Sequence, residues 1–238
     1  MVDALLSYSQ SERKHTTPSR VIEIAKPAHN GETFKFYVKI NIQTNGNTVG
    51  SISTNFCNFF SKIEDSYILG LWCADSYWWS SSVGLSNTDD KLIGEFRKFL
   101  KKIFPEERIK FNRNHIFVNS RPLLREFISA KASLDRLEDP DIIKAYFAGR
   151  FDGDGSIDKN LRNDCRIVYG RKEEAEMDKK LLGKIRISNT KIYYYKGART
   201  FCLYISRYQA KEFLGNIYPY SIKLQKLVLV PRRDLVFH

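Results

Sequence analysis

An internal repeat constrains what this chain can fold into more than any other feature of its sequence. Residues 67–76 match residues 146–155 with a shift of 79, so that Gly70 falls on Gly149 (149 − 70 = 79). Two further pairs of matching segments follow in the same order along the chain: 89–94 with 178–183, and 120–127 with 206–213. Three matches in one order indicate a structural unit that is built twice.

Each copy is predicted to follow the same plan of helix, two strands, helix, two strands and helix, because apolar spacing alternates between the helical and the strand period. The first copy has predicted helices and strands at 61–75, 77–87, 91–103, 108–119 and 121–137. The second has them at 141–154, 156–170, 173–182, 184–206 and 208–217. In the last hairpin, Ile185 and Ile187 alternate with polar residues, which predicts a strand that turns near Gly197.

This plan predicts an α+β protein with two pseudo-symmetric αββαββα domains. We place the first domain at residues 61–138 and the second, with a C-terminal tail, at 139–238. Residues 1–60 lie outside the repeat and form an N-terminal extension whose role the sequence does not give. Within it, residues 34–42 alternate as a strand does and are followed by Asn45 and Gly46, a turn signal.

Charge and cysteine usage narrow the class of protein. There are 39 Lys and Arg against 27 Asp and Glu, a formal net charge of +12, which is typical of nucleic-acid binders, although membrane-surface proteins share it. The longest apolar run, 67–74, is too short to span a bilayer, and the N-terminus does not resemble a signal peptide. Four cysteines without a CxxC pair predict reduced thiols. We therefore expect an intracellular protein, in cytoplasm, nucleoid or organelle, with no membrane partner.

The repeated helices carry the candidate chemistry. Gly70 with Ala74, and Gly149 with Gly153, are spaced four apart and so lie on one face of each helix, where they allow two backbones to approach closely. If the two helices pack there, the acids that follow, Asp75 and Asp154, emerge side by side. Paired carboxylates repel unless a cation lies between them, and their hard oxygens suit Mg²⁺ or Ca²⁺.

At these residues the chain resembles a known family. Residues 68–76 and 147–155 are similar to the two motifs of monomeric LAGLIDADG homing endonucleases, and the repeat plan resembles that family's paired domains over residues 61–225. The first motif departs from the family at Cys73 and Ser76, where acid and glycine are usual, but keeps Asp75. The resemblance implies a monomeric, intron-associated enzyme in which two sheets form a saddle over double-stranded DNA and a divalent metal serves to cut each strand.

By the same resemblance, Asp75 and Asp154, with the preceding Ala74 and Gly153, hold Mg²⁺, and Ca²⁺ or Mn²⁺ can substitute for binding or cleavage. Family active sites also use a basic or amide side chain from the strand end before the second helix. Ser86 or Asn87 and Arg171 or Lys172 occupy that region here, and we select Asn87 and Lys172 as catalytic candidates.

Hairpins can enter the major groove and present every second side chain to base edges. A slip of one residue in strand register exchanges the two faces of a sheet. The sequence therefore does not decide which face meets DNA. The candidate DNA-binding residues are Trp78, Ser80, Ser82, Arg108, Lys110, Asn112, Asn114, Arg162, Arg166, Arg171, Arg186, Ser188, Tyr194 and Arg199.

The predicted function is a site-specific homing endonuclease, a Mg²⁺-dependent phosphodiester hydrolase that cuts both strands of a long, pseudo-palindromic DNA target. The alternative keeps the fold without cleavage, as a DNA-binding regulator or an RNA-binding intron maturase. A protein-splicing intein is disfavoured because the chain starts with Met1 and ends with His238. A glycosidase would also use two carboxylates, but +12 favours a polyanionic substrate.

Overall fold

The computed structural model describes residues 19–27, 33–41, 52–54, 60–157 and 164–228. These belong to two compact units, one holding the strands before residue 55 and one holding everything from Phe60 onward. The first unit is an antiparallel sheet in the order β1 (Ser19–Pro27), β2 (Thr33–Asn41) and β3 (Ile52–Thr54). The strand predicted over 34–42 is confirmed as β2.

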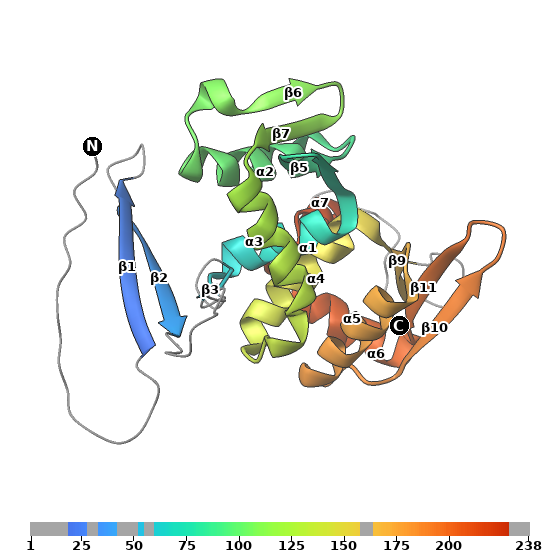
Figure 1. Ribbon diagram of the computed structural model, residues 1–238. Helices are drawn as coiled ribbons and strands as arrows, with labels where there is room; N and C mark the ends of the chain where they lie inside the picture. Colours follow the sequence, from blue (N-terminus) through green and yellow to red (C-terminus); the bar gives the residue numbers. More distant parts are fainter. Residues whose placement is uncertain (1–18, 28–32, 42–51, 55–59, 158–163, 229–238) are drawn as a thin grey trace, which may run out of the picture. The chain divides into compact units, whose positions relative to one another are not determined.

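The second unit contains both repeats (Figure 1). The first repeat consists of α1 (Ile63–Asp75), β4 (Ser76–Trp79), β5 (Ser82–Ser86), α2 (Asp90–Ile103), the short 3₁₀ helix η1 (Glu106–Arg108), β6 (Lys110–Asn112), β7 (His115–Asn119), α3 (Arg121–Ala132) and η2 (Leu134–Arg136). The second consists of α4 (Pro140–Asp154), β8 (Gly155–Ile157), β9 (Cys165–Tyr169), α5 (Lys172–Lys184), β10 (Thr190–Tyr195), β11 (Thr200–Ile205) and α6 (Arg207–Ile217). A further helix, α7 (Ile222–Val228), follows and was not predicted.

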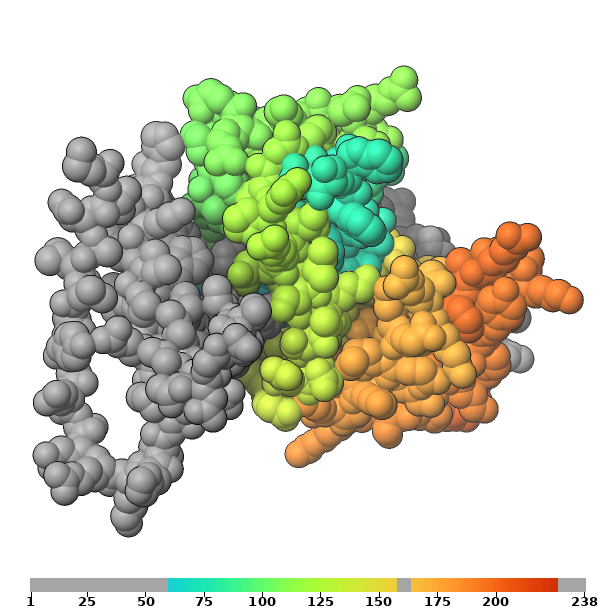
Figure 2. All heavy atoms as spheres, in the orientation of Figure 1, coloured from blue at the N-terminus to red at the C-terminus, as the bar shows by residue number. Residues whose placement is uncertain are grey.

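The two repeats have sheets of identical topology. The first sheet runs β4-β5-β7-β6 and the second runs β8-β9-β11-β10, with every neighbouring pair antiparallel. Helices cover one face of each sheet: α1, α2 and α3 contact β5, and α5 contacts β9, β10 and β11. The predicted α+β class with two αββαββα repeats is confirmed, and in Figure 2 the first repeat (cyan to green) lies directly against the second (yellow to red).

Local signals explain where the helices start. Asp139 accepts a hydrogen bond from the Asp141 backbone N–H (2.8 Å) and Pro140 occupies the first turn, so α4 begins where the sequence predicts. The predicted apolar face of α2 is buried through Leu92, Phe96 and Leu100. The helices that close the two repeats are equivalent, since Ser120 and Ser206 are their N-cap residues.

Two sequence predictions were wrong in detail. Residues 184–188 are not a strand: α5 continues to Lys184, and Ile187 N–H then bonds back to the Leu182 carbonyl in a tight turn. The match of 89–94 with 178–183 is not structural either, because Asp89 is the N-cap of α2 whereas Asp178 lies inside α5. The second repeat therefore has three extra residues between its first two helices (172 − 154 = 18 against 90 − 75 = 15).

Among the described residues, no helix is long and apolar enough to cross a membrane. Cys73, Cys165 and Cys202 are free and buried, in agreement with the prediction of reduced thiols, while Cys57 lies outside the described residues.

Candidate metal centre at the paired helices

The site is built by α1 and α4, which lie side by side in the centre of the second unit (Figure 1). Their contact is a backbone contact. A Cβ on Gly70 would lie 1.9 Å from the Tyr146 carbonyl oxygen, and a Cβ on Gly149 would lie 2.0 Å from the Tyr67 carbonyl oxygen. The two contacts are related by the repeat, since 146 − 67 = 79. Only glycine fits at either position, which confirms the close helix approach predicted from the small residues.

The same contact brings the two acids together at the helix ends. A Cβ on Gly153 would lie 2.3 Å from the Ala74 Cβ and 2.7 Å from Asp75 Oδ2. The Asp75 carboxylate therefore lies across the last turn of α4, next to the residue that precedes Asp154. Both acids are partly exposed, with 29% of the Asp154 side chain accessible. One carboxylate from each repeat thus reaches the same place.

Burial and mutual repulsion disfavour the charged forms of these acids. Burial raises the pKa of Asp154 to about 6; the Arg150 guanidinium lowers it and the Asp75 charge raises it. Burial also raises the pKa of Asp75, against a hydrogen bond that Asn87 Nδ2 donates to Asp75 Oδ2 (2.7 Å). Asn87 therefore contacts one member of the acid pair, Asp75, directly. It is the amide candidate that was selected at the strand end before the second helix.

The residues present fit a hard divalent cation. Both acids end a helix, where the dipole presents negative potential, so each lies at an unfavourable place for a carboxylate without a counter-ion. No cluster of three or more His, Cys, Asp or Glu suited to a metal occurs among the described residues. Two carboxylates are enough for Mg²⁺, which usually keeps several waters and takes further ligands from substrate phosphates.

Arg150 forms an ion pair with Asp154 from the buried side of the site. Its side chain is 2% exposed, and Nη1 lies 3.3 Å from Asp154 Oδ2. Nε lies 3.6 Å from the buried Asp178, and the guanidinium lies 4.4 Å from the centre of the Tyr169 ring. Asp178 in turn accepts hydrogen bonds from the hydroxyls of Tyr146 (2.9 Å) and Tyr169 (2.8 Å). The second repeat therefore supports its acid with a buried polar network.

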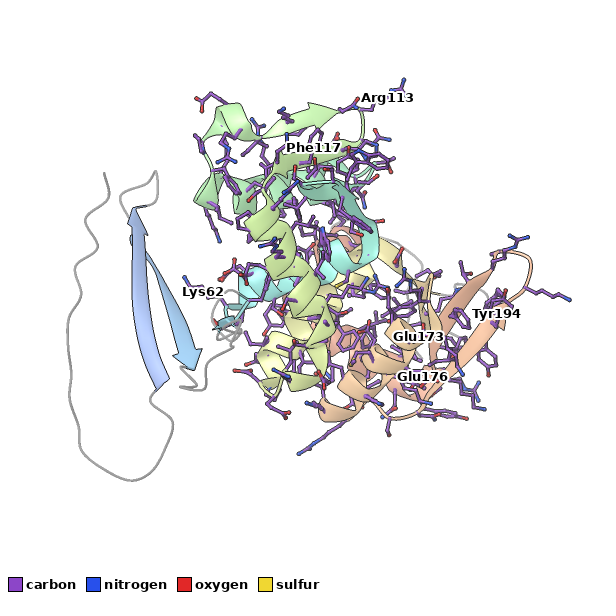
Figure 3. The ribbon with its side chains drawn as sticks, in the orientation of Figure 1. Lys62, Arg113, Phe117, Glu173, Glu176 and Tyr194 are labelled. Atoms are coloured by element: carbon purple, nitrogen blue, oxygen red, sulfur yellow. The ribbon has the colours of Figure 1, made fainter. Side chains whose placement is uncertain are left out.

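Lys172 does not reach the acids. It is the first residue of α5 and lines a hollow between α5 and the β10–β11 hairpin, together with Glu176 and Tyr194; Figure 3 labels these last two. Glu174, two positions on and so nearly opposite on the helix, is the residue that lies near Arg150 (4.0 Å). The structure thus turns Lys172 away from Asp154, because helix phase and not sequence proximity decides the direction of a side chain.

A lysine that the sequence did not single out lies at the acids instead. Lys223 of α7 donates from Nζ to the Gly155 carbonyl oxygen (2.6 Å), immediately after Asp154, and its charge lowers the pKa of both Asp75 and Asp154. It was missed because α7 follows the repeat and has no counterpart in the first copy. The only signal available was that the tail remains amphipathic as far as residue 228.

Register separates the candidate DNA-binding residues by face. In the first sheet, Val83 pairs with Val118 and Leu85 with Ile116 on the helix-covered face, which leaves the alternate residues on the open face. In the second sheet, Ile167 pairs with Leu203 in the same way. The candidates that register places on the open faces are Ser82, Lys110, Asn112 and Arg166.

Other candidates lie elsewhere. Trp78 pairs with Val83 and Tyr194 with Phe201, so both have the parity of the helix-covered faces, although their side chains are 60% and 55% exposed. Their neighbours Trp79, Tyr193 and Tyr195 have the open parity and are 46–76% exposed. Strand alternation therefore gives these two residues the opposite parity from the other strand candidates.

The remaining candidates lie outside the strands. They are Ser80, Asn114 and Arg199 in hairpin turns, Arg108 in η1, Arg171 at the start of α5, and Arg186 and Ser188 in the loop after α5. Arg162 lies outside the described residues. Arg113, which was not selected, lies at the tip of the β6–β7 hairpin (Figure 3) and has a left-handed φ of 54°, as Arg199 has at the β10–β11 turn (53°).

Comparison with known proteins reveals the fold family. No family model and no curated sequence matches the chain. Among solved structures, mesophilic variants of the homing endonuclease I-DmoI match with a TM-score of 0.57 at 17% identity, covering 72% of this chain and 100% of that one. I-DmoI in complex with DNA and Ca matches with a TM-score of 0.56 at 18% identity, covering 72% and 100%.

The homing endonuclease I-WcaI bound to its DNA recognition sequence matches with a TM-score of 0.53 at 17% identity, covering 73% of this chain and 88% of that one. Other I-DmoI complexes with DNA that match contain Mn or were formed in the presence of Mg. At these identities the comparison establishes the fold, and this protein has a LAGLIDADG-type fold, as the sequence motifs predicted.

Proposed function

We propose that the protein is a site-specific endonuclease that hydrolyses both strands of double-stranded DNA with a divalent metal held between Asp75 and Asp154. The observation that carries this proposal is the meeting of the two acids, one from each repeat, where the Asp75 carboxylate lies over Gly153. Because one chain supplies both acids and both sheets, the active form is a monomer. The DNA implies an intracellular site of action.

The metal's contribution would be to lower the pKa of the attacking water and to neutralise charge on the phosphate. Asp75 and Asp154 would hold it, with the backbone of Ala74 and Gly153 closing the site beneath. Asn87 fixes the orientation of Asp75 through the bond to Oδ2 (2.7 Å). Arg150, on the buried side, favours the charged form of Asp154 and so opposes the burial that raises its pKa. In the reaction, a water oxygen forms a bond to phosphorus and one ester P–O bond breaks, leaving a phosphomonoester and an alcohol.

Charge on the sheets supports DNA as the substrate. None of the eight described strands of the two sheets contains Asp or Glu. Three cations, Lys110, Arg166 and Lys191, have the parity of the open faces. The carboxylate next to the open face of the second sheet, Asp164, is 4% exposed and accepts a hydrogen bond from the Tyr204 hydroxyl. A polyanion that approaches these faces therefore meets no carboxylate from the strands themselves, and two sheets related by the repeat suit the two halves of a pseudo-palindromic site. Hairpin-tip arginines 113 and 199 would reach the flanking backbone.

Further support comes from the neighbours, because the fold matches enzymes whose structures were solved with DNA and with Mg, Mn or Ca. We propose Mg²⁺ as the working metal, with Mn²⁺ able to replace it and Ca²⁺ supporting binding. Because Ca²⁺ would occupy the acids without promoting hydrolysis, DNA binding can be measured in Ca²⁺ apart from DNA cleavage.

The test is selection of cleaved sites from a randomised double-stranded library in Mg²⁺, with the Asp75→Asn/Asp154→Asn double variant as control. We expect the wild type to enrich one long site and cut both strands, and the double variant to bind that site in Ca²⁺ while cutting at least about 10³-fold more slowly. Equal cleavage by the double variant would refute the site. Binding without any wild-type cleavage would favour a non-cleaving regulator, and preference for RNA a maturase.

A further inference from the structure

The second sheet has a basic hollow on the face that α5 covers. The hollow lies between α5 and the β10–β11 hairpin and has a volume of about 680 Å³, within the range of roughly 300–1,000 Å³ that is usual for small-ligand sites. Register places its strand residues, Ile192, Tyr194 and Phe201, on the same side as the buried Leu203. The sheet therefore separates the hollow from the open face that we assign to duplex DNA, so a ligand of the hollow is distinct from that duplex.

The floor of the hollow is aromatic. Tyr194 and Phe201 are a cross-strand pair whose ring centres are 5.0 Å apart and whose ring planes meet at 39°. Ile192 extends this apolar surface along β10. Tyr194 is 55% exposed even though it lies on the covered face of the sheet. It therefore offers the hollow a surface on which a flat ring can stack.

The walls of the hollow are basic. Lys172, Glu176 and Lys179 are spaced by four and three residues and so lie on one face of α5; Figure 3 labels Glu176 on this helix and Tyr194 on the facing hairpin. Arg199, at the hairpin turn, adds a third cation. Within the part of the chain that the structure describes, none of these three cations forms an ion pair or a side-chain hydrogen bond. Three cations against a single carboxylate favour an anionic ligand.

We propose that the hollow is a nucleotide-binding site, with the base stacked on Tyr194 and the phosphate held by the cations of the walls. An aromatic platform beside a basic surface is the combination that binds single-stranded nucleic acids. A duplex is a poorer match, because its bases stack on one another and it presents only phosphates, sugars and groove edges. The nucleotide is either free or one unit of a single strand, since both carry the same ring and phosphate. This site is independent of cleavage at Asp75 and Asp154.

The test measures binding of a fluorescein-labelled oligothymidylate of about eight nucleotides, a length within the range that single-strand grooves contact, to the full chain in chelator. Fluorescence anisotropy follows the complex, and thymidine triphosphate competes as the free nucleotide with the same base. Three substitutions in the hollow are each compared with the same substitution at a nearby residue that does not line it. The pairs are Tyr194→Thr with Tyr193→Thr, Lys179→Gln with Lys180→Gln, and Glu176→Gln with Glu173→Gln.

Each substitution in the hollow has an expected direction. Tyr194→Thr should weaken oligonucleotide binding at least about fivefold, because one base loses its stacking partner. Lys179→Gln should weaken binding about threefold and reduce the steepness of log K against log salt by about 0.7, the value for one phosphate contact on a single strand. Glu176→Gln should tighten binding about threefold, because it removes a carboxylate from among the cations, and unfolding cannot produce such a gain. The three control variants should each change the affinity by less than about twofold, because their side chains lie outside the hollow and salt screens them.

Oligonucleotide binding with these variant effects would support the site, and efficient displacement by thymidine triphosphate would identify the free nucleotide as its ligand. A wild type that binds neither probe, or equal losses in Tyr194→Thr and Tyr193→Thr, would overturn the nucleotide site. So would equally effective displacement by an oligoglutamate of the same charge, since an acidic peptide has no base to stack. All of these results leave the proposed endonuclease function standing, because neither probe is a duplex and the chelator removes divalent metal.

Discussion

The two acid-bearing helices share a backbone arrangement and differ in what surrounds it. On the shared side, Gly70 and Gly149 make equivalent contacts with the opposite helix. Away from it, the second repeat has Arg150 and Asp152 where the first has Leu71 and Cys73, each 79 residues earlier and each buried. A duplicated unit therefore kept the contact that both helices need and diverged where only one helix is concerned.

This divergence makes the two acids chemically unequal. Asp75 is held by a neutral amide, Asn87, whereas Asp154 is held by a buried guanidinium. Asp152 accepts hydrogen bonds from the first backbone N–H groups of α7, the helix that follows the second repeat, whereas Cys73 at the equivalent place in the first repeat is a buried thiol. We infer that the repeated glycine contact determines where the two carboxylates meet. Residues present in only one repeat, such as Asn87 and Arg150, determine how readily each carboxylate ionises.

The largest effect should come from the contact that the repeats share. Gly70→Ala and Gly149→Ala each place a methyl group within 2.0 Å of a backbone oxygen, so each should lower the free energy of unfolding by about 3 kcal/mol or more, to a similar extent in both repeats. Chemical denaturation measures this.

The matched controls are Gly94→Ala and Gly183→Ala, which lie in α2 and α5 with nothing within 4 Å of the added methyl group. They should stabilise by about 0.5–1 kcal/mol, because alanine favours the helix. A marked inequality between Gly70→Ala and Gly149→Ala would break the symmetry on which the comparison depends.

The next effect should be confined to the second repeat. Arg150→Leu leaves Asp178 buried without its cation and should cost about 3 kcal/mol in unfolding free energy. The double variant Arg150→Leu/Asp178→Asn should recover more than half of that loss, since no buried charge then remains. Leu71→Met, at the equivalent place in the first repeat, should cost less than about 1.5 kcal/mol. No recovery in the double variant would mean that Arg150 contributes packing and not charge.

A third test uses the raised pKa of Asp154. In metal-free protein the folded state holds the Asp154 proton up to about pH 6, whereas an unfolded chain releases it near the ordinary value of 3.8. Wild-type stability should therefore fall as pH rises through this window relative to Asp154→Asn, which does not titrate. Near pH 4 the two should be equal, and at pH 7 the variant should be more stable by about 1–3 kcal/mol.

Thermal unfolding in chelator at both pH values measures the difference. Asp75→Asn should gain less, because Asn87 stabilises the Asp75 carboxylate. A stability difference that does not change between pH 4 and pH 7 would contradict an Asp154 that burial makes hard to ionise.

The smallest change in unfolding free energy should come from Asn87, which supports Asp75 with a hydrogen bond, whereas Arg150 supports Asp154 with a charge. Asn87→Ala removes the hydrogen bond to Asp75 and the one that Asn87 Oδ1 accepts from the Asp89 backbone N–H (2.7 Å), and should cost about 1 kcal/mol at pH 7. Asn112→Ala, on exposed β6, should change stability by less than about 0.5 kcal/mol. If Asn87→Ala changes the free energy of unfolding as little as Asn112→Ala does, the Asn87 amide does not stabilise the Asp75 carboxylate.

Much of this arrangement was predictable because periodicity and small-residue spacing act locally. The helix plan, the glycine contact and the meeting of Asp75 with Asp154 follow from such patterns, whereas Asn87 was selected through the family resemblance. Which strand face meets DNA could not be predicted, because a single-residue shift exchanges the faces, and register gives Trp78 and Tyr194 the opposite parity from Ser82 and Arg166. Residues 184–188 alternate in burial but form a turn, so alternation alone misled the strand assignment.

The buried network and α7 were beyond sequence reasoning for a different reason. Arg150 and Asp178 meet only when α4 packs against α5. The two residues are 28 positions apart in the sequence (178 − 150 = 28), so no local sequence pattern predicts that they form an ion pair. Lys223 reaches the acids only because Asp152 caps a helix 70 residues later (222 − 152 = 70). Long-range polar partners are specified by tertiary geometry, which one sequence does not reveal.

The most direct measurement is the anomalous-difference map of crystals soaked in Mn²⁺. The account predicts a peak between α1 and α4 with one oxygen of Asp75 and one of Asp154 at about 2.1–2.4 Å, and no peak there in the Asp75→Asn/Asp154→Asn variant. Mn²⁺ bound elsewhere, with both carboxylates empty in the wild type, would contradict the joint metal site.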